Sequence, residues 1–294
     1  MKKVFFVGFG NLLTAMVTPF DANNQVDFAK TTKLIEYLLA NGSEGLVVGG
    51  TTGESPTLTT DEKIALFKHT VKVVNNRVPV IAGSGSNSTQ ASITLTKAAE
   101  KSGADGIMLV APYYNKPNQE GLYRHFAAIA GETALPVMLY NIPGRSAVKI
   151  SAEIIIRLSQ IDNIVSVKEA SGDLDLAADV IEHTADNFSV YSGEDSITLP
   201  LLSLGADGVV SVVSHIAGND MSEMLKAYQS GDVARAASIH RKLLPVMKGM
   251  FAQPSPVPVK TALNMNGIDV GDVRLPLLAM TDSEKEILKN LIQR

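Results

Sequence analysis

Residues 102–112 read Ser-Gly-Ala-Asp-Gly-Ile-Met-Leu-Val-Ala-Pro, and this stretch decides the fold class. Residues 91–101 before it have helical spacing, so Gly103 falls where a glycine commonly ends a helix. Residues 106–112 are apolar without alternation, as in a strand covered on both faces of a parallel sheet. A second Gly-Ala-Asp-Gly leads into an apolar run at residues 205–208. The repeating unit is therefore a helix followed by a buried parallel strand.

Apolar runs of this kind recur along the chain, and segments with helical spacing separate them. The predicted strands are residues 14–20, 45–50, 78–84, 106–112, 136–142, 164–170, 188–194 and 208–215. The clearest helical segments are residues 28–40, 91–101 and 122–130, with another helix start at Thr59, where Asp61 and Glu62 fall in the first turn. Eight strands, each followed by a helix, predict an α/β fold of the (β/α)8 TIM-barrel type.

The predicted barrel covers residues 1–218, and residues 219–294 are expected to form additional C-terminal helices packed on it. The Pro-rich stretch 254–258 predicts a turn at the barrel's edge. A doubly wound dinucleotide-binding fold is disfavoured, because residues 83–85 lack the third glycine of its fingerprint and no phosphate-binding G-x-x-x-x-G-K occurs.

Composition excludes several classes of function. The 26 basic and 30 acidic residues give a net charge of −4, which argues against nucleic acid as a partner. The chain has no cysteine, so disulfides, thiolate zinc sites and a cysteine nucleophile are excluded. No apolar run approaches the roughly 20 residues of a membrane span, so no membrane partner is expected. Residues 1–7 resemble the start of a signal peptide, but glycines interrupt the apolar stretch and no cleavage site follows. A cytoplasmic location is expected.

Barrel active sites form at the carboxyl ends of the strands, so the residues found there are the candidates for catalysis. Lys168 ends the run Ile-Val-Ser-Val-Lys, where a desolvated amine with a lowered pKa would suit Schiff-base chemistry. The commoner fate of a lone lysine is to extend into solvent. Tyr140, one strand away, can relay a proton to or from a carbinolamine, although buried tyrosines more often only pack in the core.

Two loops offer groups that bind carboxylates. Thr51 and Thr52 lie between Gly50 and Gly53, and such a loop either presents hydroxyls and N–H groups to a small carboxylate or forms a plain turn. Arg145 follows Pro-Gly and either binds a second carboxylate or is a surface charge.

Histidine spacing gives no sign of a metal site. The five histidines form no metal-binding pair, so no catalytic metal is expected. Among them His215 is placed to face the barrel mouth, and the others are expected on helix surfaces.

Four motifs, taken in order, resemble the pyruvate-dependent class I aldolases, the superfamily of sialic-acid lyase and dihydrodipicolinate synthase. They span nearly the whole chain: Gly-Thr-Thr-Gly-Glu-Ser at 50–55, Pro-Tyr-Tyr-Asn-Lys-Pro at 112–117, Tyr-Asn-Ile-Pro at 140–143 and Val-Lys-Glu-Ala at 167–170. The Thr51-Thr52 pair and Arg145 resemble the dihydrodipicolinate synthase branch most. That resemblance implies condensation of pyruvate with L-aspartate 4-semialdehyde, giving 4-hydroxy-tetrahydrodipicolinate for diaminopimelate and lysine biosynthesis.

The resemblance also implies residue roles. Lys168 would form a Schiff base with pyruvate, with no separate cofactor. The hydroxyl relay would consist of Tyr140, Thr51 and Tyr114, and Tyr114 would reach in from a neighbouring subunit of a homo-oligomer, either a dimer or a tetramer. Substrate contacts would come from Thr52, Arg145, Gly193 and Val210.

Lysine-inhibited members of the family bind lysine at the subunit interface. The matching interface positions here are Ser55, Asn87 and Tyr113. Ala91 stands where sensitive enzymes usually have Glu, and Lys63 where they often have His, so like-charge repulsion predicts weak lysine inhibition.

Two alternatives remain open on sequence. The first is another pyruvate aldolase, acting on N-acetylneuraminate or a 2-keto-3-deoxy-sugar acid, because Lys168 and Tyr140 would serve it equally. The second is a non-catalytic sensor on a barrel scaffold, since fold does not fix function.

Overall fold

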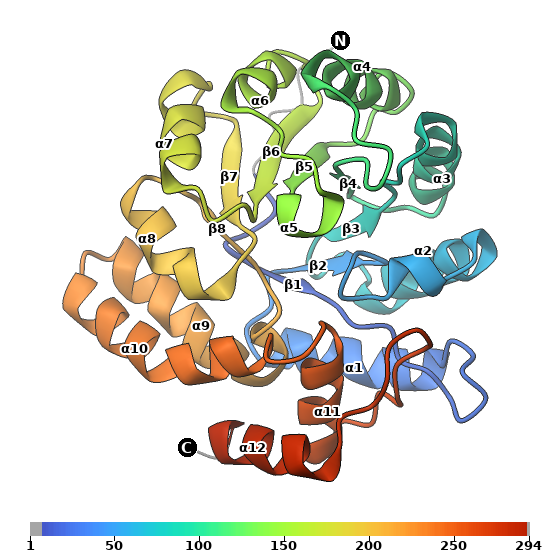
Figure 1. The fold of residues 1–294 in the computed structure, drawn as a ribbon, viewed down its shortest axis with the longest axis vertical. Coiled ribbons are helices and arrows are strands. Elements are labelled where there is room, and N and C mark those ends of the chain that lie inside the picture. Colours follow the sequence, from blue (N-terminus) through green and yellow to red (C-terminus); the bar gives the residue numbers. More distant parts are fainter. Residues whose placement is uncertain (1–7, 293–294) are drawn as a thin grey trace.

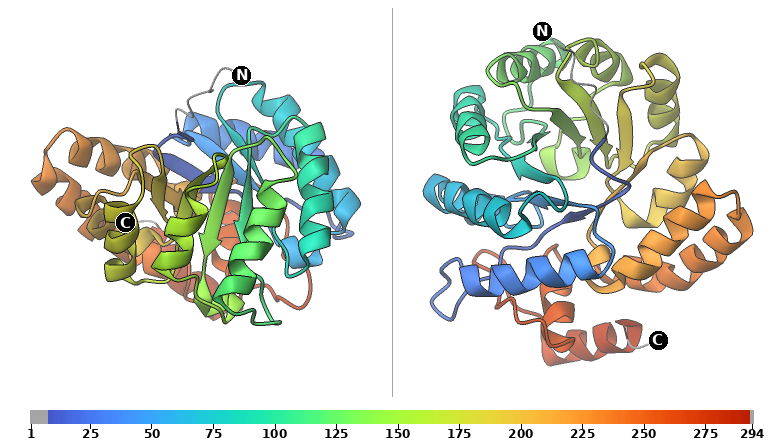
Figure 2. Two further views of the ribbon diagram at one scale, coloured as in Figure 1. Left: turned by 90° about the horizontal axis from the view of Figure 1, so that it is seen from above. Right: turned by 180° about the vertical axis from the view of Figure 1, so that it is seen from behind.

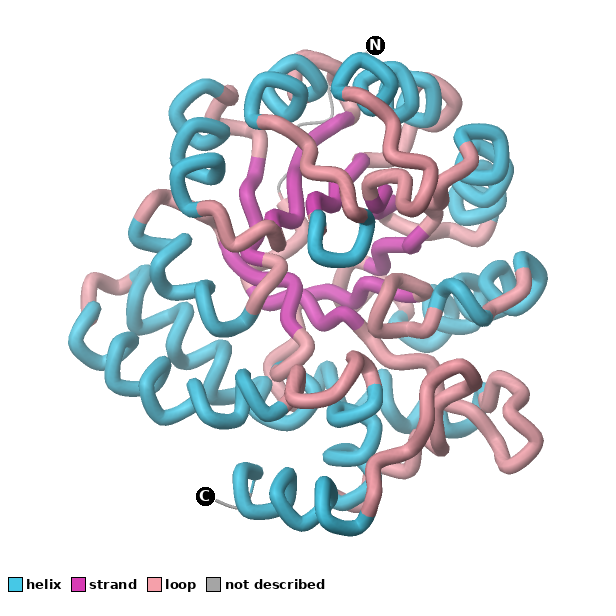
Figure 3. Tube along the Cα trace, in the orientation of Figure 1, coloured by secondary structure: helices cyan, strands magenta, loops and turns pink. Residues whose placement is uncertain are grey.

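The computed structural model describes residues 8–292 and shows a closed barrel of eight parallel strands in chain order (Figures 1 and 3). The strands are β1 Leu12–Ala15, β2 Gly45–Val48, β3 Val80–Gly83, β4 Gly106–Val110, β5 Val137–Asn141, β6 Ile164–Glu169, β7 Ser189–Ser192 and β8 Gly208–Ser211. Strand β1 pairs with both β2 and β8, which closes the sheet. The predicted (β/α)8 barrel is confirmed. The signal-like residues 1–7 lie outside the described residues.

The observed strands are shorter than the apolar runs that predicted them. Residues after the last paired position of a strand form the barrel mouth instead. The first predicted strand, residues 14–20, is wrong in its bounds. Strand β1 begins two residues earlier and ends at Ala15. Residues beyond it leave the sheet, and Phe20 instead pairs with Val26 in an isolated bridge.

Helices surround the barrel, as the ring of coils in Figure 3 shows. Their bounds are α1 Phe28–Ala40, α2 Thr60–Val74, α3 Thr89–Lys101, α4 Gln119–Ala130, α5 Pro143–Ser146, α6 Ala152–Leu158, α7 Leu174–His183, α8 Thr198–Ser203, α9 Ser214–Gln229, α10 Val233–Gly249, α11 Val257–Met265 and α12 Asp282–Ile292. Thr59 caps α2 in a reciprocal capping box with Glu62, as its position predicts. Gly103 has φ +84°, the left-handed conformation expected of a glycine that ends a helix.

The C-terminal helices gather on one side of the barrel (Figure 2). Helix α9 packs on β1 and α10, and α12 packs on α10 and α11. The expected boundary at residue 218 falls inside α9, one residue past a kink at Ala217. Whether the chain divides into two units at this point stays a prediction. Within residues 8–292, no helix has both the length and the apolar character that crossing a membrane would require.

Two sets of apolar side chains form the core, one between barrel and helices and the other inside the barrel. The inner set runs from Phe9, beside the Tyr191 hydroxyl, up to Tyr140. Packed side chains therefore fill the barrel interior. The open space of the site begins above this packed interior, at the carboxyl ends of strands β2 to β5.

Candidate active site

A cavity of about 260 Å³ opens at the carboxyl ends of strands β2 to β5. Helix α5 lies across this part of the barrel mouth in Figure 1. The lining comes from the ends of these strands and from the segments that follow them: Gly49, Gly50, Thr51, Ser55, Pro56, Gly83, Gly85, Met108, Val110, Tyr113, Tyr140, Ile142, Arg145 and Ser146. Residues far apart in sequence thus meet at one site, as the barrel predicts.

Lys168 and Tyr140 are paired across β6 and β5, so both side chains leave the sheet at the same level. The Lys168 ammonium nitrogen lies 4.3 Å from the centre of the Tyr140 ring. Lys168 is only 4% exposed, so its side chain does not extend into solvent. Burial lowers the pKa of Lys168 to about 8, although the carboxylate of Asp195 acts in the opposite direction. Near neutral pH a usable fraction of this amine is uncharged.

The pKa of the Tyr140 phenol is shifted upward, opposite to that of Lys168. Burial raises the pKa of Tyr140 to about 12, against the opposing effects of the Arg145 charge and a hydrogen bond with the Thr51 side chain. Tyr140 therefore keeps its proton at neutral pH. The bond to Thr51 brings together two members of the predicted relay.

The loop of residues 50–55, here called the glycine loop, is fixed by its own backbone and by the segment that follows β1. The Glu54 N–H donates to the Thr51 carbonyl over 3.0 Å, and the Ser55 N–H donates to the Gly50 carbonyl over 3.2 Å. The Thr18 hydroxyl donates to the Gly53 carbonyl over 2.7 Å. Thr51 lines the cavity, whereas Thr52 is buried next to it and is not part of the lining. The loop is thus an ordered structure rather than a loose turn.

The three remaining predicted contact residues lie at different depths. Arg145 is exposed on α5, and its charge reaches Lys168 and Tyr140. Gly193 adjoins β6 so closely that a Cβ there would lie 2.6 Å from the Ala170 Cβ and 3.0 Å from the Lys168 Cγ. A larger residue at this position would therefore press on the segment that carries the lysine. Val210 is buried in the inner core, in the same apolar cluster as Tyr140.

Tyr114 does not join the site of its own chain. Its side chain is 89% exposed, and its backbone has φ +74°, an uncommon conformation for an aromatic residue. Tyr113 and Ser55 line the cavity, and the Asn87 carbonyl accepts a 2.8 Å bond from Asn115 in the same loop as Tyr114. Any role of Tyr114 in proton transfer would have to be played in another copy of the chain.

Asp195 is the main residue that the sequence reasoning missed. It is 1% exposed, and its carboxylate accepts bonds from the N–H groups of Val212 and Val213, at 3.0 and 3.1 Å, and from the Ser211 hydroxyl. Burial raises the pKa of Asp195, while these bonds and Lys168 act in the opposite direction. The available signal was its position three residues after β7, close to the predicted contact residue Gly193.

One histidine that was predicted to lie on a helix surface is buried. His125 is 7% exposed and packs edge-on against Phe126, so its predicted surface position is wrong. His215 does not line the cavity, because its ring is held between the Val17 N–H and the Val212 carbonyl. Within residues 8–292, no three metal-ligating side chains gather into a group.

The fold and the site define a (β/α)8-barrel enzyme with a buried lysine amine at its mouth. The sequence profile of the Dihydrodipicolinate synthetase family matches residues 8–294. The 4-hydroxy-tetrahydrodipicolinate synthases of Oceanobacillus iheyensis and Bacillus subtilis are each 60% identical, each over 97% of this chain and over 97% and 99% of their own lengths. A crystal structure of a Bacillus anthracis dihydrodipicolinate synthase superposes with a TM-score of 0.97 at 58% identity, covering 98% of this chain and 99% of that one. The chain belongs to the dihydrodipicolinate synthetase family.

Proposed function

We propose that this enzyme condenses pyruvate with L-aspartate 4-semialdehyde through a Schiff base on Lys168, giving 4-hydroxy-tetrahydrodipicolinate for diaminopimelate and lysine biosynthesis. The observation that carries the proposal is the buried amine of Lys168, with its pKa lowered to about 8, facing Tyr140 at the barrel mouth. The two relatives above carry the name of this activity along nearly their full lengths.

The steps follow from the chemistry of the amine. Lys168 adds to the keto carbon of pyruvate, and loss of one water gives a protonated imine. Loss of a methyl proton then gives an enamine, whose carbon attacks the aldehyde carbon while the aldehyde oxygen takes up a proton. The amino group of the second substrate displaces the lysine, closing the ring and releasing Lys168. One water leaves overall, and no separate cofactor is needed.

The other site residues have proposed roles that match their positions. Tyr140 and Thr51 pass protons between the reacting atoms and solvent, since they are already hydrogen-bonded. Thr52 and the backbone N–H groups of the glycine loop hold the pyruvate carboxylate, and Arg145 holds the carboxylate of the aldehyde. Gly193 and Val210 are proposed to contribute backbone contacts.

The proposed partners are these two substrates and further copies of the chain in the cytoplasm. Exposed Tyr114 supports a homo-oligomer, because the relay would be completed only by a neighbouring copy. Neither a nucleic acid nor a membrane is proposed as a partner.

Mass spectrometry after incubation with pyruvate and borohydride tests the covalent step. The expected result is a reduced pyruvyl adduct on Lys168 alone, and a folded sample without adduct would contradict the proposal. Supplying L-aspartate 4-semialdehyde, N-acetylmannosamine or glyceraldehyde in turn then identifies the acceptor. Rapid turnover with N-acetylmannosamine or glyceraldehyde, but not with L-aspartate 4-semialdehyde, would favour the alternative lyase.

A further inference from the structure

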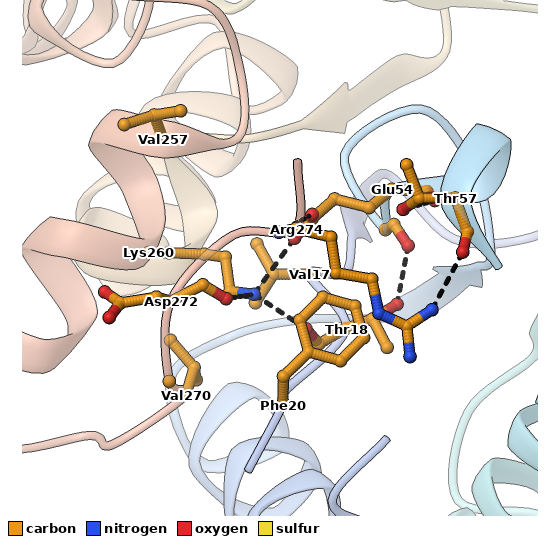
Figure 4. Close-up of polar contacts among 12 residues, drawn as sticks. Val17, Thr18, Phe20, Glu54, Thr57, Val257, Lys260, Val270, Asp272 and Arg274 are labelled. Carbon is orange, nitrogen blue, oxygen red and sulfur yellow. Dashed lines mark hydrogen bonds and ion pairs between the residues drawn. The ribbon is translucent and has the colours of Figure 1, made fainter. Parts of the chain in front are cut away.

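A buried ion pair joins the C-terminal segment to the glycine loop (Figure 4). The Lys260 ammonium, on α11, lies 2.9 Å from a carboxylate oxygen of Glu54, and each side chain is 2% exposed. The second oxygen of Glu54 accepts the Arg274 N–H over 2.9 Å. The two residues of the pair are 206 positions apart in sequence.

The hydrogen-bonding capacity of the Lys260 ammonium is fully used. Besides Glu54, it donates to the carbonyls of Thr18 at 3.0 Å and Asp272 at 2.6 Å. A lysine ammonium has three donors, so each finds an acceptor. The Phe20 ring lies 4.2 Å from the same nitrogen. The ammonium is therefore held in one position, between the segment after β1 and the segment after α11.

Stability is a weak explanation for such a pair. Removing two charges from water offsets most of their attraction, and apolar residues of similar volume often stabilise a protein as well or better. Removing one partner leaves the other buried and unpaired, which is strongly destabilising. A buried pair that adds little net stability but fixes a geometry is better explained by what it positions.

Glu54 is part of the glycine loop itself. Its backbone is left-handed, with φ +57°, and its N–H bonds to the carbonyl of Thr51. Thr18 bonds Lys260 through its carbonyl and Gly53 through its hydroxyl, so both attachments lead to the same loop. A shift of the Glu54 backbone would therefore act on Thr51 through the N–H hydrogen bond and on Thr52 through the chain between them.

We propose that Glu54 and Lys260 are positioning residues, through which the C-terminal segment holds Thr51 and Thr52 in the geometry that the reaction requires. This inference rests on the proposed function, because those threonines are the proposed relay and carboxylate site. Neither Glu54 nor Lys260 lines the cavity, so their effect on the reaction is indirect.

The decisive comparison is between the single variants and the paired variant Glu54→Gln with Lys260→Met. Each single change is expected to lower the Tm, because it leaves a buried charge or a buried polar group without its partner. The paired variant is expected to regain only the part of the Tm that the unpaired charge costs, because the Thr18 and Asp272 carbonyls lose their donor whenever Lys260 is replaced. Its kcat/KM for pyruvate is expected to stay about tenfold or more below wild type, because small misplacements of catalytic groups are costly. Paired recovery of both the Tm and kcat/KM would overturn the positioning role.

Glu54→Asp gives a second test that does not depend on the paired variant folding. It keeps the charge on Lys260 neutralised but is one methylene shorter, so the loop must shift to keep the bond. Reduced kcat/KM at a near-native Tm is expected, and wild-type kinetics would overturn the proposal.

The matched control is the partly exposed pair Lys30–Asp269, 2.9 Å apart, which also ties the C-terminal segment to the barrel. Lys30→Met with Asp269→Asn is expected to leave the kinetics unchanged, and a loss equal to that of the buried pair would overturn the proposal. The borohydride assay on wild type distinguishes a failure of the proposed function from a failure of the positioning role. Absence of a wild-type adduct contradicts the proposed function, whereas wild-type kinetics in the paired variant contradict only the positioning role.

Discussion

The ammonium nitrogen of Lys168 lies 4.3 Å from the centre of the Tyr140 ring, inside a closed barrel. Burial shifts the two groups in opposite directions, lowering the pKa of Lys168 to about 8 and raising that of Tyr140 to about 12. At neutral pH the amine readily gives up its proton, while the phenol keeps one to donate. This pairing is the physical basis of the predictions below.

Lys168→Met is expected to abolish the borohydride-trapped adduct and to lower kcat by at least about a thousandfold, because the nucleophile is lost. Its Tm is expected to equal or exceed that of wild type. The folded-state pKa of Lys168 lies below that of an unfolded lysine, so the amine costs stability at neutral pH and less as the pH rises above about 8. Any stabilisation by Met should therefore shrink at alkaline pH. An adduct that persists in this variant would place the Schiff base elsewhere.

The rate of adduct formation at fixed pyruvate is expected to rise about tenfold from pH 7 to pH 9, because the neutral fraction of an amine with a pKa of about 8 grows by that factor.

Asp195→Asn removes a negative charge that favours the charged amine, so the rise in the rate of adduct formation is expected to move to lower pH. The same change is expected to lower stability by about 1–3 kcal/mol, because an amide cannot satisfy all the donors that face Asp195.

Asp207→Asn is the control for this prediction. Asp207 also accepts a backbone N–H, that of Val190 at 2.8 Å, but it is not among the charges that act on Lys168. Its pH profile is expected to match wild type. An unshifted profile in Asp195→Asn would remove that carboxylate from any role in tuning the lysine.

Tyr140→Phe is expected to lower kcat by about 10²–10⁴, the range typical of a lost proton-transfer group. The Lys168 adduct should still form, but more slowly. Tyr191→Phe provides the comparison, since Tyr191 is a buried barrel tyrosine whose hydroxyl accepts the Phe9 N–H instead. Similar losses of kcat in both variants would mean that Tyr140 acts only through packing.

Mixed oligomers test the proposed role of Tyr114. Tyr114→Phe and Lys168→Ala chains are each expected to have little activity alone. After mixing and subunit exchange, sites with an intact Lys168 would receive Tyr114 from the other chain, and activity is expected to return. Failure to recover activity in proven mixed oligomers would show that Tyr114 is not supplied across an interface.

Sub-millimolar lysine is expected to inhibit the enzyme weakly or not at all. Ala91 is exposed in the first turn of α3, where it offers no carboxylate to the amine of a bound lysine. Ala91→Glu is expected to strengthen inhibition by up to about fivefold, the value of a good surface ion pair. Strong inhibition of the wild type in an assay with added lysine would refute this account.

The sequence was enough to predict the barrel and the position of Lys168, because both depend on local patterns. Continuous runs of apolar residues predict the buried strands. Gly103 ends a helix because glycine readily adopts the left-handed conformation. A lysine at the end of a buried strand can be recognised from the sequence alone, because it follows a run of apolar residues. The strand ends were predicted less well, since the residues beyond Ala15 are apolar yet leave the sheet.

Tertiary structure alone decided the electrostatics. Lys168 and Tyr140 face each other because of the register between β5 and β6. The groups that surround Asp195 come together because β7 pairs with β8. In sequence, nothing links Glu54 with Lys260, 206 positions away, but folding makes them a buried pair. Local patterns report the conformation of neighbouring residues. The pKa of a group and the partner of a charge are set by atoms brought close from distant parts of the chain.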